Sequence, residues 1–65
     1  MKLFDIIEKI DESQLVIVSD PANDELARYD GKNSIPAGFL LNSVMSIYAY
    51  IENGAAVIRI QIYDN

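Results

Sequence analysis

The densest group of side chains that could do chemistry is acidic and lies in the stretch D20-P-A-N-D-E25. Asp20, Asp24 and Glu25 could supply oxygen ligands to a hard cation such as Ca²⁺. The stretch lacks the central Gly and the final Glu of an EF-hand loop. Its Pro, Asn and Asp are typical turn residues, because Pro presets φ and the other two hydrogen-bond locally. We therefore expect an ordinary turn with solvated carboxylates, and no metal site.

Enzymatic chemistry has few candidate groups in this chain. There is no His and no Cys, so zinc-type sites and disulfides are excluded and general base work would fall to Asp or Glu. A nucleophile would have to be Ser, Tyr or Lys, and no Ser-x-x-Lys, G-x-S-x-G, P-loop or G-x-G-x-x-G pattern is present. The sequence predicts a protein that is not an enzyme and that holds no cofactor.

The clearest structural signal is the pair Asn53-Gly54 between two alternating apolar segments. Both positions of a type I′ turn need positive φ, and Asn-Gly is the pair that tolerates it best. A hairpin with this turn places Glu52 opposite Ala55. The pairs expected on one face are all apolar: Ile51–Ala56, Ala49–Ile58, Ile47–Ile60 and Met45–Ile62. Because turn chemistry and side-chain alternation agree on one register, we predict a hairpin with this face beneath a helix.

The reverse face of the hairpin is amphipathic. Its expected pairs are Tyr50–Val57, Tyr48–Arg59, Ser46–Gln61 and Val44–Tyr63. Interfaces favour Tyr and Arg, which combine a large contact area with a polar end. Tyr and Val are also good strand formers on any solvated sheet face, so this alternative stays open. We also expect Val16 or Val18 on this face, since Leu15 and Ile17 would point to the helix, and the added apolar area favours an interface.

The other segments complete an α+β domain. Residues 2–11 carry apolar side chains at helical spacing, at Leu3, Ile6, Ile7 and Ile10. In residues 14–19 apolar side chains occupy both faces of the expected strand, which is typical of a strand in the interior of a sheet. Residues 25–30 are more polar and predict an edge strand. Turns are expected at residues 20–24 and 30–34. Ser34 and Pro36 favour the start of a short helix. The predicted order is α-β-β-(short α)-β-β, with the N-terminal helix packed on one face of a mainly antiparallel four-stranded sheet.

Length and charge limit the classes of partner. Sixty-five residues predict a single domain, 1–65, near the lower size limit for independent folding. A net charge of −5, with the five Lys and Arg scattered along the chain, argues against direct binding of nucleic acid. No apolar run approaches the ~20 residues of a membrane span, and no signal peptide is apparent. We expect a cytoplasmic protein.

Four further features stand out along residues 3–62: a strand ending Y29-D-G31, the I35-P36 segment, V44-M-S-I-Y-A-Y and V57-I-R-I60. In these features the chain resembles small uncharacterised proteins carried by phages and mobile elements of Gram-positive bacteria. Some small acidic phage proteins, the anti-CRISPR type among them, inhibit host machinery by stoichiometric binding. The resemblance therefore implies a possible inhibitor, and it assigns no site residues.

Two functional hypotheses follow. In the first, the chain is a binding module that engages a protein through the Tyr-rich face or the acidic rim, and a related variant is homodimerisation through the Tyr-rich face. The candidate partner-binding residues are Tyr48, Tyr50, Arg59, Tyr63, Asp20, Asp24 and Glu25. In the second, it is a small-ligand binder or a nucleic-acid mimic whose carboxylates, at Asp20, Asp24, Glu25 and Asp30, imitate phosphates.

Overall fold

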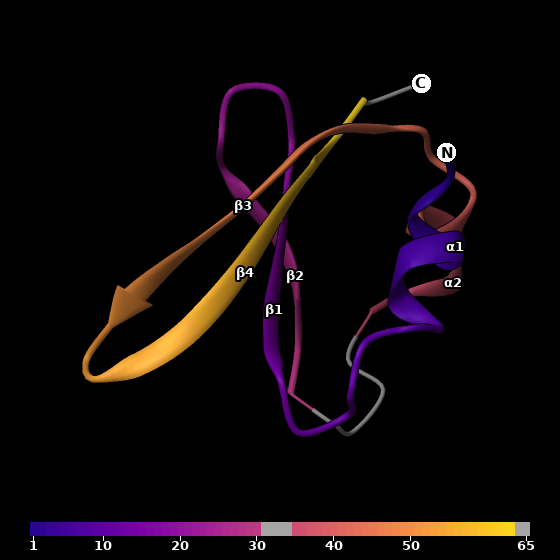
Figure 1. Ribbon diagram of the computed structural model, residues 1–65. Helices are drawn as coiled ribbons and strands as arrows, with labels where there is room; N and C mark the ends of the chain where they lie inside the picture. The colour runs from indigo at the N-terminus through magenta and orange to yellow at the C-terminus, as the bar shows by residue number, and fades with distance from the viewer. Residues whose placement is uncertain (31–34, 64–65) are drawn as a thin grey trace.

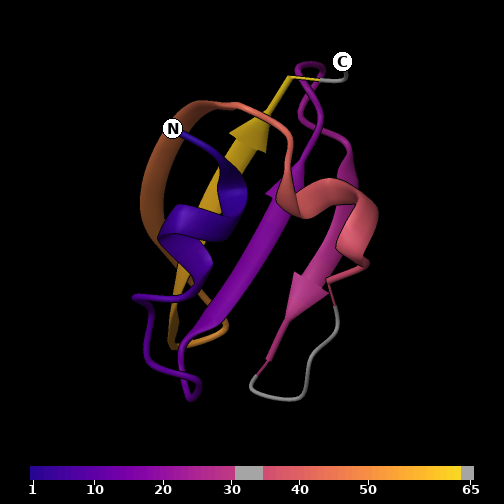
Figure 2. The same cartoon turned by 90° about the vertical axis from the view of Figure 1, so that its right-hand side faces the viewer.

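The computed structural model describes residues 1–30 and 35–63. Its elements, in chain order, are α1 (Leu3–Ile7), β1 (Leu15–Ser19), β2 (Glu25–Tyr29), α2 (Ala37–Leu40), β3 (Val44–Glu52) and β4 (Ala55–Ile62). The strands form one sheet in the order β2-β1-β4-β3. Both helices lie on the same side of this sheet, α1 in front of β4 and α2 toward β2 (Figures 1 and 2). The fold is therefore a two-layer α+β arrangement.

The sheet is mixed. β1 pairs antiparallel with β2, and β3 pairs antiparallel with β4, but β1 and β4 run parallel. The sequence predicted a mainly antiparallel sheet and gave no indication of the parallel pair. The parallel pairing of β1 with β4 is explained by burial. These two strands hold most of the residues with almost no exposed surface, and together they occupy the centre of the sheet. The more polar β2 lies at an edge, as its composition predicted.

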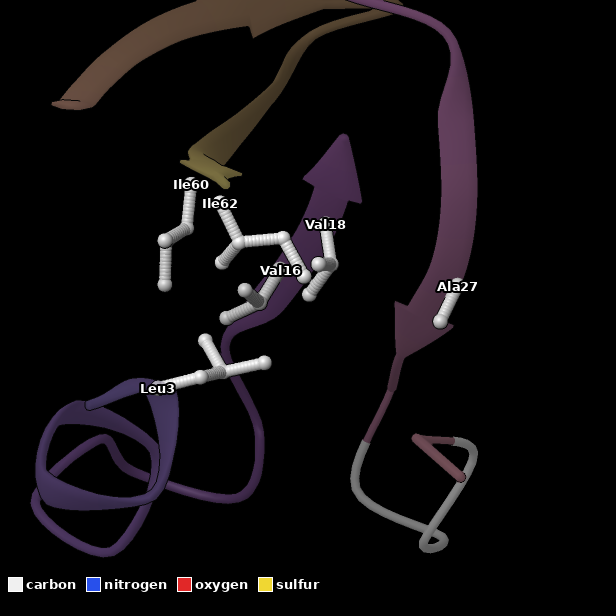
Figure 3. Packing of buried hydrophobic residues seen from close by; sticks show 6 residues of the cluster. All are labelled: Leu3, Val16, Val18, Ala27, Ile60 and Ile62. Carbon is white, nitrogen blue, oxygen red and sulfur yellow. The ribbon is translucent and has the colours of Figure 1, made fainter. Parts of the chain in front are cut away.

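The main core lies between the central strands and α1. Its buried members are Leu3, Val16, Val18, Ala27, Ile60 and Ile62. Leu3 points from α1 toward Val16 and the β4 isoleucines (Figure 3). Val16 and Val18 thus face the helix, and Ile17, which is also buried, must point to the opposite side. The expectation that Val16 or Val18 would emerge on the Tyr-rich face was wrong, and Ile17 takes that place.

The N-terminal helix is shorter than predicted. It ends at Ile7, and the amides of Lys9 and Ile10 bond three residues back, to Ile6 and Ile7. The apolar residues expected on one helix face still reach the core, because these tighter turns keep Ile10 packed against it. Asp11 then accepts hydrogen bonds from both the amide and the hydroxyl of Ser13, at 2.8 and 2.7 Å, and the chain enters β1.

The C-terminal hairpin has the expected register over most of its length. The pairs run from Glu52–Ala55 to Ser46–Gln61 as predicted. Asn53 and Gly54 between the strands have φ values of 54° and 80°. A type I′ turn requires positive φ at both residues, and the turn type itself stays a prediction.

At the other end of the hairpin the register shifts. Val44 lies opposite Ile62, so the predicted pairs Met45–Ile62 and Val44–Tyr63 are wrong. Met45 is the extra residue of a bulge, which turns Val44 toward the core and leaves Met45 exposed.

The second helix begins at Ala37, directly after Pro36. The predicted cap at Ser34 and most of the turn at residues 30–34 lie outside the described residues. Ile35, Phe39 and Leu40 pack against the core cluster.

Much of the hairpin has no helix above it. The hairpin extends away from α1 and α2 toward its tip (Figure 1). Ile47 and Ile51 were expected beneath the helix, but they are 48% and 71% exposed. A helix of five residues is too short to cover strands of nine and eight residues.

Two conservative substitutions test this division between the core and the uncovered hairpin. Ile60→Val removes one methylene group from a fully buried side chain and should lower the free energy of unfolding by about 0.5–1.5 kcal/mol. Ile51→Val makes the same change at an exposed position and should alter it by less than ~0.5 kcal/mol. Urea denaturation followed by circular dichroism measures both. Equal losses in the two variants would contradict the packing described above.

Candidate protein interface

We call the sheet face turned away from the helices the Tyr–Arg face. Its residues include Leu15, Ile17, Arg28, Ser46, Tyr48, Tyr50, Val57, Arg59 and Gln61. The register aligns Arg28, Ile17, Arg59 and Tyr48 in one row, with one residue from each strand. The chain's two arginines thus lie on the same face on either side of Ile17. In the sequence they are far apart and appear scattered.

The arginine of β4 holds the β1–β2 loop against this face. Arg59 donates from Nε to the side-chain oxygen of Asn23 at 3.0 Å, and from a terminal nitrogen to the Asn23 carbonyl at 2.8 Å. The Tyr48 hydroxyl also donates to the Asn23 side-chain oxygen, at 3.1 Å. We call this set of contacts the Asn23 latch. It joins the loop of one hairpin to the strands of the other.

The loop is built to present Asn23 in this way. The Asp20 carboxylate accepts the amide of Asp24 at 2.9 Å, and the Asn23 amide donates to the Asp20 carbonyl at 2.8 Å. Asn23 itself has a φ of 71°, a conformation that Asn tolerates better than most residues. The predicted turn at residues 20–24 is therefore present, and the Asp20 carboxylate helps to close it.

Long side chains cover a small second core on the Tyr–Arg face. Ile17 and Val57 are only 2% and 1% exposed, although the helices lie on the other side of the sheet. The cross-strand neighbours of Ile17 are the two arginines, and those of Val57 are Leu15 and Tyr50. The stems of such residues can cover apolar neighbours while their polar ends stay in water.

The tyrosines are held in place as well as grouped. The rings of Tyr48 and Tyr50 lie 6.1 Å apart at an angle of 32°. Tyr50 accepts a hydrogen bond from Arg59 at 3.3 Å. Tyr48 and Arg59 are cross-strand partners, as the sequence predicted. The guanidinium makes its hydrogen bonds to Asn23 and to the Tyr50 hydroxyl.

A surface ion pair borders the face at β2. Arg28 donates to both carboxylate oxygens of Glu25, at 2.9 and 3.1 Å. This hydrogen bonding lowers the pKa of Glu25 below its ordinary value, and the charges of Arg28 and Arg59 lower it further. The same contact raises the pKa of Arg28. The Glu25 carboxylate thus keeps its negative charge to lower pH and is paired with Arg28.

The structure brings together only part of the predicted site. Tyr48, Tyr50 and Arg59 lie on one face, and Glu25 lies close enough to Arg59 for their charges to interact. Tyr63 is separated from its predicted partner Val44 by the bulge, and its backbone bonds to Ser43 and Asn42 instead.

Asp20 and Asp24 contribute to loop closure. Asn23 and Arg28 were missed in the sequence. The tolerance of Asn for positive φ was the only local signal for Asn23.

Outside this face the described part of the chain offers little for chemistry. Residues 1–30 and 35–63 contain no group of three or more acidic residues placed to hold a metal ion. In the same ranges no helix is long and apolar enough to cross a membrane. Comparison with protein-family models, with curated proteins and with solved structures finds no match to this chain.

The Glu25–Arg28 pair predicts a specific titration. In Arg28→Gln the pKa of Glu25 should rise toward its ordinary value, whereas the pKa of Asp11, lowered by its hydrogen bonds from Ser13, should not change. Carboxyl-detected NMR titration measures both groups in one sample. A Glu25 pKa that is the same in the two proteins would show that the ion pair does not form in solution.

The lowered pKa of Glu25 also determines how the Glu25–Arg28 pair contributes to stability at different pH values. Because the pKa is depressed in the folded state, the pair stabilises the fold above the ordinary pKa of Glu. That contribution is lost as the pH falls through the lowered value. Exposed pairs contribute only about 0.2–1 kcal/mol, so the change in stability should be small.

The Asn23 latch predicts a difference between two substitutions. Asn23→Gly keeps the carbonyl that Arg59 binds and adopts the positive φ without strain, whereas Asn23→Ala keeps a Cβ in a conformation that costs roughly 1–2 kcal/mol and loses the polar side chain that lets Asn tolerate it. The Ala variant should therefore be the less stable in urea. Both variants should increase the solvent exchange of the Arg59 Nε proton observed by NMR, while Pro21→Ala in the same loop should not. An unchanged exchange rate in both Asn23 variants would contradict the latch.

Proposed function

We propose that this chain is a non-enzymatic binding module that engages a protein through the Tyr–Arg face. The observation that carries the proposal is the Asn23 latch, because it fixes Arg59 and Tyr48 on an open sheet face. Tyr48 remains 41% exposed and the Arg28 side chain 46%. Tyr and Arg are the residue types that most often dominate binding energy at protein interfaces.

Pre-organisation is what distinguishes this face from an ordinary solvated one. Ordering a flexible side chain at an interface costs about 0.5–1.5 kcal/mol. Arg59 and the two tyrosines already have fixed hydrogen-bond or ring partners, so a partner protein would meet side chains whose freedom is partly lost. Their remaining donors and ring surfaces favour a partner with acceptor groups and a flat apolar area.

The acidic alternative has weaker support. A nucleic-acid mimic needs carboxylates that point freely to solvent in a phosphate-like array. Glu25 is held by Arg28, and Asp20 accepts the Asp24 amide. Two of the proposed carboxylates therefore have structural partners. The resemblance to small phage-borne proteins agrees better with inhibition by stoichiometric protein binding in the cytoplasm.

Substitution of one exposed aromatic residue tests the proposal. Tyr48→Ala should lower the affinity for the partner by about tenfold or more, the loss that corresponds to ~1.4 kcal/mol at a central aromatic contact. Phe4→Ala is the matched control, because Phe4 is an aromatic residue of similar exposure, 48%, on the opposite layer. Tagged wild-type and variant chains are compared by quantitative affinity capture from a bacterial lysate, followed by titration of the captured protein.

A result with no difference between the two variants would overturn the assignment of this face. Circular dichroism of both variants shows whether they remain folded, so that a loss of binding is not caused by unfolding. Charge-neutralising substitutions at Asp20 and Asp24 give the reciprocal test. Loss of binding in those variants, with binding kept in Tyr48→Ala, would favour the acidic alternative.

A further inference from the structure

The outer side of β3 is a long and almost uncharged sheet edge. β3 is the last strand in the sheet order, and its residues Val44 to Ile51 include no charged side chain. Met45, Ile47 and Ile51 of this strand are 42%, 48% and 71% exposed, and the register places Ile47 and Ile51 on the face toward the helices. Such an edge offers unpaired backbone groups to another strand, and natural proteins usually protect it.

The opposite edge of the sheet is protected in the usual ways. β2 has only five residues, its register shifts where Leu26 bulges, and it carries the Glu25–Arg28 ion pair. Short length, a bulge and charged side chains each discourage further pairing. β3 also has a bulge, at Met45, but it is longer than β2 and its register with β4 is regular and uncharged from Ser46 to Ile51, so the two edges differ.

The start of the β3 edge is occupied by the N-terminal residues. Lys2 forms an isolated bridge with Ser43, and the Val44 amide donates to the Met1 carbonyl at 2.8 Å. Beyond this point no described strand pairs with the outer side of β3. The open part of the edge is thus residues 45–51.

We propose that two copies of the chain associate by pairing residues 45–51 of β3 antiparallel with themselves. A two-fold axis perpendicular to the sheet at Tyr48 places Ile47 opposite Ala49 and Met45 opposite Ile51 of the second copy. The helices of both copies then lie on the same side of one continuous sheet. This arrangement is isologous, the kind of interface that closes after two subunits.

Charge and residue type favour a second copy as the occupant. Each copy carries a net charge of −5, yet no charged residue lies within the paired segments. The exposed apolar residues of one copy meet those of the other, so a self-complementary row of Ile47 and Ala49 forms along the helix side. A pair centred on Tyr48 also places Glu52 beyond the paired segment at both ends.

The size of the chain gives an independent reason for association. Small domains usually need a disulfide, a metal or another subunit to supplement a limited core. This chain has no Cys. The total accessible surface is 4078 Å², and a standard interface of about 800 Å² per partner would take roughly a fifth of it. A seam of seven residues is smaller than that standard, so we expect a weak dimer that forms at high protein concentration.

Sedimentation equilibrium over a range of concentrations tests the dimer. The wild-type mass should rise from 7.3 kDa toward twice that value as the concentration increases. Ile51→Lys should keep the chain monomeric. Leu41→Lys, which makes the same change at a residue of similar exposure, 73%, at the end of α2, should associate as the wild type does. A wild-type chain that stays monomeric at millimolar concentration overturns the proposal and leaves the edge to a strand of another protein.

Disulfide trapping tests the register, because the chain has no cysteine of its own. Residues directly opposite on antiparallel strands have Cβ atoms about 4.5–5.5 Å apart, close to the separation that a disulfide needs. An equal mixture of Ile47→Cys and Ala49→Cys copies should form the mixed disulfide several-fold faster than either variant links to itself. Equal rates would overturn the register. A dimer that forms equally in Ile51→Lys would place the interface elsewhere, such as the Tyr–Arg face. Binding of another protein through that face is measured separately, so the two proposals can fail independently.

Discussion

The parallel pairing of β1 with β4 is the interaction on which the rest of the structure depends. It joins the two hairpins into one sheet and places the most apolar strands side by side at its centre. Because side chains alternate along a strand, one pairing creates two different faces. Val16, Val18, Ile60 and Ile62 form the core with Leu3 on one side. On the other side Ile17 and Val57 are also buried, and their cross-strand neighbours Arg59 and Tyr50 have side chains long enough to cover them.

The Asn23 latch strengthens the same junction from outside the sheet. It is a second connection between the β1–β2 loop and the β3–β4 hairpin, in addition to the β1–β4 ladder. Arg59 bonds both the side chain and the backbone of Asn23, so it fixes the position of the loop as well as its own rotamer. A group that stabilises the junction is thereby also presented on an open face. Arg59 therefore has a structural role besides the binding role proposed for it, and a substitution of Arg59 alone would not separate the two.

The sequence predicts local features well and non-local ones poorly. The hairpin register follows from Asn53-Gly54 together with alternation, because both signals lie within the same twenty residues. The parallel pair has no such local signal, since any apolar strand could lie beside β1. The side of the sheet on which Ile17 lies depends on the β1–β4 pairing, so the prediction from the sequence assigned it to the wrong side. The bulge at Met45 depends on how the chain end packs, which explains why the Val44 and Tyr63 partners were missed.

The short first helix explains why the apolar surface of this chain is unevenly covered. Its five residues place Leu3 over the central strands, and the apolar turn that follows still brings Ile10 to the core. The outer half of the hairpin lies beyond its reach, so the isoleucines of β3 keep much of their surface in water, whereas Ile60 and Ile62 of β4 keep none. Burial of apolar area contributes about 25 cal/mol per Å². The apolar area that stays exposed on β3 therefore does not stabilise the single chain. The fold therefore has one face ordered by polar contacts and one edge with apolar area still to bury, and the two differ in the kind of partner they favour.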